Sequence, residues 1–309
     1  MVSPKPPASG FPPVIDYEGS DYQSTFWEKG ERDYEDQVEA VALRRLLPSS
    51  GKLLLEVGAG AGRNTPRYGG FERVVLLDYS LSQLRLAQDR LGHGERYIFV
   101  AADAYRLPFA PGQFDAATMI RTLHHMVEPQ RALGQIAEAL QPRGVFILEY
   151  ANKRNLKAIL RYSLRRQEWS PFSLEPVEFA ALNFDFHPQA VQNWLNACDL
   201  TIERQLTVSH FRVGLLKRWV PLRLLVALDS LVQWTGNWWQ LSPSAFVRAR
   251  STRRDAIQHY NTLTFRCPAC MYYPLEDISG TLNCTNCAKS WPIREGIYDF
   301  REKYLADPE

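Results

Sequence analysis

Cysteine is scarce in this chain of 309 residues, and long uninterrupted apolar runs are missing. Five cysteines are too few for a disulfide scaffold in a chain of this length. No apolar run approaches the roughly 18 residues of a membrane-spanning helix. The sequence opens on a proline-rich leader over residues 1–13 rather than on a charged segment followed by an apolar one. We therefore expect a cytoplasmic protein.

The sequence does contain enough apolar material for a packed core. Hydrophobic residues make up 45% and charged residues 23%, which excludes general disorder. The net charge of +2 is unevenly spread, because residues 151–254 hold 15 Lys and Arg against 7 Asp and Glu, a local +8 that leaves −6 elsewhere. Residues 152–166 carry six of these basic residues and no acid. Such a face is either solvated or contacts nucleic acid, anionic lipid or an anionic substrate.

Short apolar runs alternate with amphipathic runs between residues 51 and 150, which predicts a doubly wound α/β fold with a parallel sheet. We predict strands over 53–57, 74–78, 97–103, 114–120 and 145–150, and helices over 80–91 and 130–140. Further on, we predict a helix over 188–198, a strand over 201–208, an apolar helical stretch over 213–234 and a last strand over 244–250. The expected divisions are a leader with cap helices (1–50), a main domain (51–250) with insertions at about 151–186 and 211–242, and a small C-terminal domain (262–303).

The first predicted strand runs into the glycine-rich turn Glu56-Val57-Gly58-Ala59-Gly60-Ala61-Gly62. A strand, a glycine turn and a helix in succession are typical of a site for a nucleotide-containing cofactor. Arg63 stands where the dinucleotide pattern needs its final glycine, and the P-loop pattern is absent. An acid, Asp78, ends the next strand.

Residues 53–150 resemble the class I S-adenosylmethionine (SAM)-dependent methyltransferases of the type 11 kind, a branch that includes enzymes of quinone biosynthesis. The resemblance rests on LLEVGAGAGR, VVLLDYS, AADAYRLPF, FDAATMIRTLHH and LQPRGVFILEY, which stand in the family's order. It implies a seven-stranded, mostly parallel sheet with helical insertions, and SAM as the co-substrate. It also implies the cofactor-binding residues Glu56, Gly58, Ala59, Gly60, Gly62, Asp78, Tyr79, Asp103, Ala104 and Arg121.

These roles agree with the chemistry of the residues. Glycines let the backbone approach a ligand closely, and Asp78 can accept hydrogen bonds from both ribose hydroxyls. The resemblance places Asp103 near the adenine amino group and Glu56 near the amino end of the methionine. Taken alone, Asp103 would be interpreted as a turn cap.

His124 and His125 follow the fourth strand and are the candidate catalytic residues. Open α/β sheets bind ligands at the carboxyl ends of their strands, where an imidazole can act as a base or a donor. The alternative is that one histidine packs against or caps the following loop. Further candidates for substrate contact, with turn chemistry as the alternative, are Glu149, Tyr150, Asn183, Asp185 and His187.

The sequence RTLHH stands where enzymes that methylate exocyclic amines often carry [DN]PPY. The absence of the [DN]PPY motif disfavours methylation of exocyclic amines such as those of DNA bases, so we expect no DNA partner. Oxygen, carbon and sulfur acceptors remain open.

The remaining motif is a pair of CxxC sequences, Cys267/Cys270 and Cys284/Cys287, with thirteen residues between them. Four thiolates at this spacing form a tetrahedral metal site, for which zinc is well suited and iron is the alternative. A site closed by four cysteines is structural, and it would hold together a module too small for a sizeable core. The segment also resembles the small zinc-ribbon proteins that activate tRNA, ribosomal and release-factor methyltransferases.

Three acceptor hypotheses remain open. A small or lipophilic molecule comes first, because the apolar stretch over 213–234, with Trp238 and Trp239, is either a helical cap or an interfacial segment that touches lipid. RNA comes second, because of the ribbon and the +8 stretch. A non-catalytic SAM-binding protein comes third.

Overall fold

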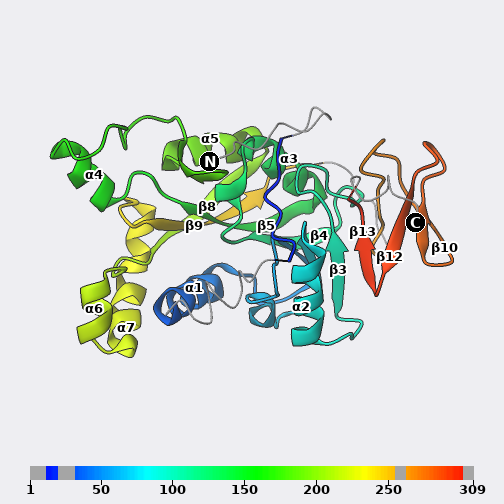
Figure 1. Ribbon diagram of the computed structural model, residues 1–309, viewed down its shortest axis with the longest axis horizontal. Helices are drawn as coiled ribbons and strands as arrows, with labels where there is room; N and C mark the ends of the chain where they lie inside the picture. The colour runs from blue at the N-terminus through cyan, green and yellow to red at the C-terminus, as the bar shows by residue number, and fades with distance from the viewer. Residues whose placement is uncertain (1–11, 20–31, 255–261, 302–309) are drawn as a thin grey trace.

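The computed structural model describes residues 12–19, 32–254 and 262–301. Its centre is an 11-stranded sheet with the order β10-β11-β12-β13-β3-β2-β1-β4-β5-β9-β8 (Figure 1). The strands are β1 (Gly51–Val57), β2 (Phe71–Asp78), β3 (Tyr97–Ala101), β4 (Phe114–Met119), β5 (Leu140–Ala151), β8 (Leu200–Val208), β9 (Ser244–Ser251), β10 (Glu276–Ile278), β11 (Thr281–Asn283), β12 (Ser290–Arg294) and β13 (Ile297–Asp299). A separate hairpin pairs β6 (Val177–Ala180) with β7 (Asn183–Asp185).

The seven strands from β3 to β8 form the doubly wound sheet that the sequence predicts. The first five strands of the chain run parallel to one another, and β9 lies between β5 and β8 and is antiparallel to both. In the central register Leu55 lies beside Val75 and Ala117. These strands are continuous apolar runs because both faces of the sheet are covered.

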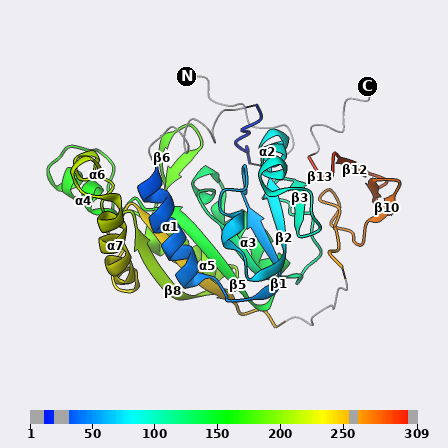
Figure 2. The same cartoon turned by 90° about the horizontal axis from the view of Figure 1, so that it is seen from below.

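The helices divide between the two faces of the sheet (Figure 2). Leu54 and Leu76 pack in one core with α1 (Asp33–Leu46), α2 (Leu81–Leu91) and α7 (Leu222–Val232). Leu55 and Leu77 pack in the other core with α3 (Pro129–Ala139) and α5 (Pro188–Ala197). Because strand side chains alternate between faces, neighbouring leucines contribute to different cores.

Local signals set the helix ends as expected for α2. The Ser80 hydroxyl accepts a hydrogen bond from the Gln83 amide at 3.3 Å and caps the helix. Gly92, with φ of 84°, ends it. Of the expected N-terminal region, α1 is described, whereas residues 1–11 and 20–31 lie outside the described residues.

The apolar stretch over 213–234 is helical, as expected, but it is not one continuous helix. It is divided into α6 (Gly214–Trp219) and α7, with Val220 and Pro221 between them, and continues as the 3-10 helix η4 (Gln233–Asn237). The break follows from Pro221, because proline has no amide hydrogen to continue a helix. The insertion after β5 holds α4 (Leu156–Ser163) and the β6–β7 hairpin.

The cysteine module, residues 262–301, continues the same sheet. Its strand β13 pairs in parallel with β3, and the Phe300 amide donates to the Ala101 carbonyl at 2.8 Å. The ring of Phe265 lies 5.9 Å from that of Phe109. The module thereby covers a strand edge that would otherwise expose unpaired amides. None of the described helices has the length and apolar character needed to cross a bilayer.

Candidate active site

The glycine turn after β1 requires glycine for two reasons. Gly58, Gly60 and Gly62 have φ values of 73°, 52° and 71°, a region that other residues rarely adopt. A Cβ added to Gly58 would lie 2.0 Å from the Thr122 hydroxyl oxygen. The turn and the start of the loop after β4 are therefore in backbone-to-side-chain contact.

Asp78, at the end of β2, fixes the other side of this turn. Its carboxylate accepts hydrogen bonds from the amides of Gly60 at 2.8 Å and Ser80 at 2.9 Å. Burial raises the pKa of Asp78, and these two amide donors offset part of that effect. The acid is thus held at the tip of the strand by the backbone around it.

These elements enclose a first cavity of about 760 Å³, counting the part open to solvent. Seven of the predicted site residues line it: Gly58, Gly60, Asp78, Tyr79, Ala104, Arg121 and His125. Apolar residues that sequence reasoning did not select, including Val14, Ile15, Leu77 and Met126, complete the wall. We call this space the cofactor cavity.

The other predicted cofactor residues lie behind its wall. Glu56 is buried and accepts hydrogen bonds from the hydroxyls of Thr65 at 2.6 Å and Tyr68 at 3.1 Å. Burial raises the pKa of Glu56 to about 7. The Asp103 carboxylate accepts from the Tyr105 amide at 2.8 Å, as a turn cap does. Ala59 and Gly62 do not line the cavity, and Gly62 packs close to Leu91 of α2.

A second cavity of about 1110 Å³, also partly open to solvent, adjoins the first. The two share Tyr17, Arg121 and His125 in their walls. The second adds mostly polar side chains from separate segments: His124, Glu149, Asn155, Asn183, Asp185, Arg212 and Ser244. We call this space the acceptor cavity.

The neighbouring histidines of the 3-10 helix η3 (Leu123–His125) have different environments. His125 uses both ring nitrogens, because Nε2 is 3.1 Å from the Tyr17 hydroxyl and Nδ1 is 3.1 Å from the Leu182 carbonyl. A carbonyl only accepts, so Nδ1 donates and Nε2 accepts from Tyr17 in the neutral ring. Burial lowers the pKa of His125 in agreement with this state.

His124 lines the acceptor cavity, and within residues 12–19, 32–254 and 262–301 no hydrogen bond or ion pair to its ring is found. Its ring centroid lies 3.9 Å from that of His125. Burial, with His125 and Arg121 nearby, lowers the pKa of His124 well below its usual value. The ring is therefore neutral at pH 7 and able to accept a proton.

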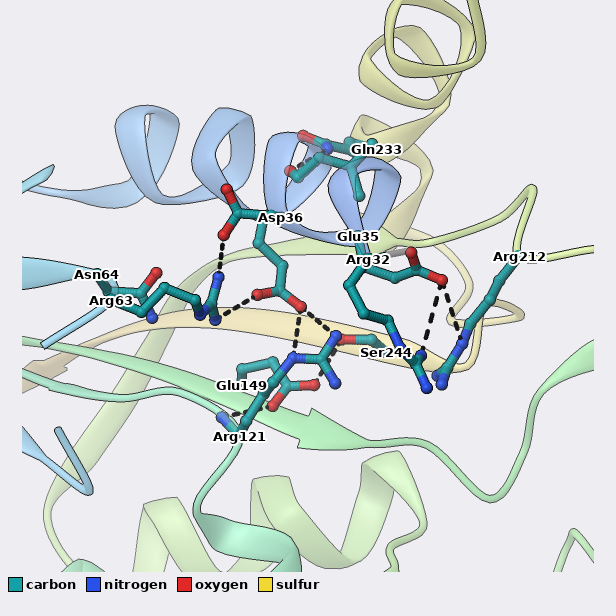
Figure 3. Close-up of polar contacts among 12 residues, drawn as sticks. Arg32, Glu35, Asp36, Arg63, Asn64, Arg121, Glu149, Arg212, Gln233 and Ser244 are labelled. Atoms are coloured by element: carbon teal, nitrogen blue, oxygen red, sulfur yellow. Dashed lines mark hydrogen bonds and ion pairs between the residues drawn. The ribbon is translucent and has the colours of Figure 1, made fainter. Parts of the chain in front are cut away.

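Arg121 is held between α1 and β5 by carboxylates on both sides (Figure 3). Its guanidinium binds Glu39 of α1, with Nε 2.7 Å from the carboxylate, and its amide donates to Glu149 at 2.9 Å. Arg63 binds the same Glu39 at 2.9 Å. Burial alone would raise the pKa of Glu39, but Arg121 and Arg63 hold it below its usual value. The sequence analysis did not predict that α1 supplies a carboxylate to this site, although Glu35 and Glu39 share a helix face at i, i+4 spacing.

Two carboxylic acids of the acceptor cavity have raised pKa values. Glu149 accepts from the Ser244 hydroxyl at 2.6 Å, and burial raises its pKa. Burial, followed by the charge of Glu149, raises the pKa of Asp185 to about 6. Of the other candidates, Asn183 lines the cavity, Tyr150 is buried outside its wall, and His187 accepts from the Gln189 amide as the cap of α5.

The four cysteines of the module converge. Their sulfur atoms lie within 4.8 Å of one another, with Cys267 and Cys287 at 3.6 Å and Cys270 and Cys284 at 3.4 Å. A tetrahedral zinc site with bonds of about 2.3 Å requires sulfur separations of about 3.8 Å. The donor set and its spacing therefore fit a metal ion.

Comparison with known proteins relates part of this sequence to methyltransferases. Residues 55–148 match a family described as a methyltransferase domain. A demethylmenaquinone methyltransferase of Clavibacter sepedonicus is 30% identical over 162 residues, which cover 52% of this chain and 66% of that protein. The O-methyltransferase cnsE of Penicillium expansum is 36% identical over 103 residues, 32% of this chain and 37% of that protein. The chain thus spans two thirds or less of these relatives.

Solved structures agree on the fold. A complex of the Haloferax volcanii Trm112 methyltransferase activator with a methyltransferase gives a TM-score of 0.54 at 15% identity, covering 75% of this chain and 96% of that one. A SAM-dependent methyltransferase from Mesorhizobium loti gives 0.52 at 20% identity, covering 70% and 99%. The chain therefore contains a methyltransferase domain, and it has the Rossmann-like fold found in SAM-dependent methyltransferases.

Proposed function

We propose that this protein transfers a methyl group from SAM to an oxygen or carbon acceptor on a small, lipophilic molecule. The observation that carries the proposal is the pair of adjoining cavities, one at the glycine turn and one lined by titratable side chains, with a shared wall. Methyl transfer needs donor and acceptor held in line, and two connected cavities provide separate places for them.

The cofactor cavity would hold SAM, which supplies an electrophilic methyl group when bound. Asp78 would accept hydrogen bonds from the ribose hydroxyls, and the open space beside the backbone of Gly60 would leave room for the ligand. The four cysteines of the module would hold Zn²⁺ in a closed, structural site.

In the acceptor cavity, His124 is the residue suited to hold the proton that the acceptor loses. Its ring is neutral and has no partner among the described residues, whereas both nitrogens of His125 are engaged. His125 is therefore a positioning residue, fixed between Tyr17 and Leu182. Asp185, with a pKa of about 6, lines the same cavity and is charged at neutral pH, and a negative charge there would favour a protonated imidazole.

The relatives support a small-molecule acceptor. The C. sepedonicus protein is named for demethylmenaquinone and the P. expansum protein for O-methylation. The first name fits a quinone-type acceptor, and the second fits an oxygen acceptor.

RNA is the second candidate, supported by the +8 stretch over 151–254, the cysteine module and the fold likeness to the H. volcanii complex. Salt distinguishes the two, because RNA binding weakens steeply as salt increases and binding of a neutral lipid does not. A non-catalytic SAM-binding protein is a third, weaker candidate.

The test is methyl transfer from isotope-labelled SAM into a cell extract that is then divided into organic-soluble, RNA and protein fractions. Label in the organic-soluble fraction supports the proposal, and label in RNA replaces it with the second candidate. His124→Ala, which leaves the cofactor cavity intact, is the matched control for transfer that depends on this protein. SAM binding without label in any fraction would favour the third candidate.

A further inference from the structure

Large apolar side chains are exposed at one end of the molecule. Both views place α4, α6 and α7 at the end opposite the cysteine module (Figures 1 and 2). Trp238 is 74% exposed, Leu231 and Trp219 are 73% exposed, and Leu164 is 62% exposed. We call this set the apolar end surface; it also includes Leu156, Leu160, Leu224, Leu228, Trp239 and Leu241.

The exposed residues follow the spacing of helix faces. Leu224, Leu228 and Leu231 lie on one side of α7, which buries Leu225 and Asp229 on its other side. On α4, Leu156, Leu160 and Leu164 form a second stripe. The segment after α7 joins the two, because the Leu241 carbonyl accepts from the Leu156 amide at 2.8 Å.

The helices are also fixed in place beneath this surface. Tyr34 of α1 donates to the buried Asp229 of α7 at 2.7 Å, and Asp229 also accepts from the His210 amide at 2.8 Å. Arg45 of α1 donates to the Ser230 carbonyl at 2.6 Å. The outward leucines of α7 are therefore the exposed face of an anchored helix.

Basic residues predominate in the segments that carry this surface. No acid occurs from residue 152 to 167 or from 204 to 228, whereas these segments contain eleven Lys and Arg. Arg161, Arg165 and Arg166 are exposed beside the leucines of α4. Arg218 lies 5.9 Å from the ring of Trp219. Basic side chains bordering Trp and Leu are typical of segments that enter the interface of an anionic membrane.

Two other occupants fit less well. A second copy of the chain would bring basic borders of like charge against each other across a symmetric contact. Single-stranded RNA would use the basic residues and the tryptophans, but it gives no role to six exposed leucines on two helix stripes.

We propose that the apolar end surface binds the surface of an anionic membrane, with the tryptophans and leucines inserted at the interface and the basic residues on lipid headgroups. The acceptor cavity opens among the same segments, since its lining includes Asn155, the cap of α4, and Arg212, which precedes α6. For the proposed methyl transfer, on which this last step rests, a lipophilic acceptor would enter the cavity from the membrane.

The test is co-sedimentation of the full chain with vesicles, without SAM or acceptor. Vesicles of phosphatidylcholine alone are compared with vesicles of equal parts phosphatidylcholine and phosphatidylglycerol. We expect binding to the anionic vesicles only, weakened but not abolished by high salt, because the apolar contacts do not depend on screening. No binding to the anionic vesicles would overturn the proposal.

Matched variants assign the binding to the surface. Arg161→Glu, Arg165→Glu and Arg166→Glu together are expected to weaken binding by roughly fivefold or more per charge, whereas Lys52→Glu, Arg73→Glu and Arg90→Glu, also exposed but remote, leave it unchanged. Leu231→Ser with Trp238→Ser is expected to lower binding, and Leu86→Ser with Ile278→Ser is its control. Equal losses in both sets would contradict the assignment.

Two further measurements separate the alternatives. A dimer in vesicle-free solution that Leu231→Ser with Trp238→Ser dissociates would identify a second copy as the occupant and overturn the membrane proposal. Tight binding of single-stranded RNA that the same pair of substitutions weakens would identify RNA instead. Since vesicle binding is measured without methyl transfer, its failure leaves the proposed enzymatic activity standing, and the reverse also holds.

Discussion

The two adjoining cavities have walls of different residue types. The cofactor cavity is lined largely by backbone and apolar side chains at the ends of neighbouring parallel strands. The acceptor cavity is lined by charged and polar side chains from segments between Tyr17 and Ser244 in the sequence. The same sheet edge thus supports one space determined by backbone geometry and another determined by side-chain chemistry.

Electrostatics follow the same division. Asp78 is the acid in the wall of the cofactor cavity, and its carboxylate is bound by two amides. The acceptor cavity contains His124, Glu149 and Asp185. The pKa of each is shifted in the direction that favours the uncharged form. Three titratable side chains with shifted pKa values therefore line the acceptor cavity, where the proposed reaction releases a proton.

The largest expected effect tests whether the cofactor cavity depends on the cysteine module. Cys267→Ser together with Cys284→Ser should remove the bound metal and unfold residues 262–301. The loss should extend to the cofactor cavity, because Phe300 pairs with Ala101 and the Arg301 guanidinium donates to the Tyr79 carbonyl at 3.2 Å.

Metal content by mass spectrometry and SAM affinity by calorimetry would check this prediction. Cys198→Ser, outside the module, is the control and should change neither. Unchanged SAM affinity in a metal-free chain would show that the cofactor cavity stands without the module.

His124→Ala should break the acceptor side alone. We expect kcat to fall by roughly 10²- to 10⁴-fold, the contribution of a general base, with SAM affinity unchanged. His187→Ala, which removes a helix cap outside both cavities, should preserve kcat. Steady-state kinetics with SAM binding measured in parallel would test this, and equal kcat for the two variants would remove His124 from the chemistry.

Asp78→Ala should break the cofactor side alone. Loss of two charge-assisted hydrogen bonds, at about 1.5–3 kcal/mol each, predicts a loss in SAM affinity of roughly a hundredfold or more. Asp78→Asn keeps one carbonyl oxygen and can accept from only one of the amides of Gly60 and Ser80, so its SAM affinity should lie between those of wild type and Asp78→Ala. Calorimetry that gives wild-type affinity for Asp78→Ala would reject the assigned role.

Gly58→Ala should strain the boundary between the two cavities. The new methyl group meets Thr122 at a positive φ, and we expect a loss of about 1–3 kcal/mol in the free energy of unfolding. Gly112→Ala is the matched control, since Gly112 has φ of 71° but open space around it. Denaturant unfolding should show the smaller loss for Gly112→Ala, and Thr122→Ala should partly rescue Gly58→Ala.

The smallest expected effect is a pH dependence confined to the acceptor side. Asp185 becomes protonated as pH falls through about 6, so kcat/KM should fall there, and Asp185→Asn should remove that inflection. Its folded pKa is raised above the unfolded value, so its contribution to stability falls as pH rises from about 4 to 6. The gain in the denaturant midpoint of Asp185→Asn over wild type should therefore be larger at pH 8 than at pH 4. The same gain at both pH values would contradict the assignment.

Sequence patterns predicted some of the residues that line each cavity and missed others, and the reason is physical. Gly58, Gly60 and Asp78 belong to short motifs at strand ends, and parallel strands bring such ends to one edge. The ion pairs from Glu39 to Arg121 and Arg63 join α1 to loops far along the chain, and no local periodicity reports such contacts. The apolar pattern predicts helical structure over 213–234, but it does not report the division between α6 and α7 at Pro221.

The pairing of β13 with β3 has a consequence for how the two parts of the chain are kept together. Both strands belong to one polypeptide, so every molecule is made with the two parts in equal number, and dilution does not separate them. The local concentration of one part at the other is fixed by the covalent link, typically in the millimolar range or above. Supplying or withholding a free subunit therefore cannot control this contact, which depends on the folding of residues 262–301.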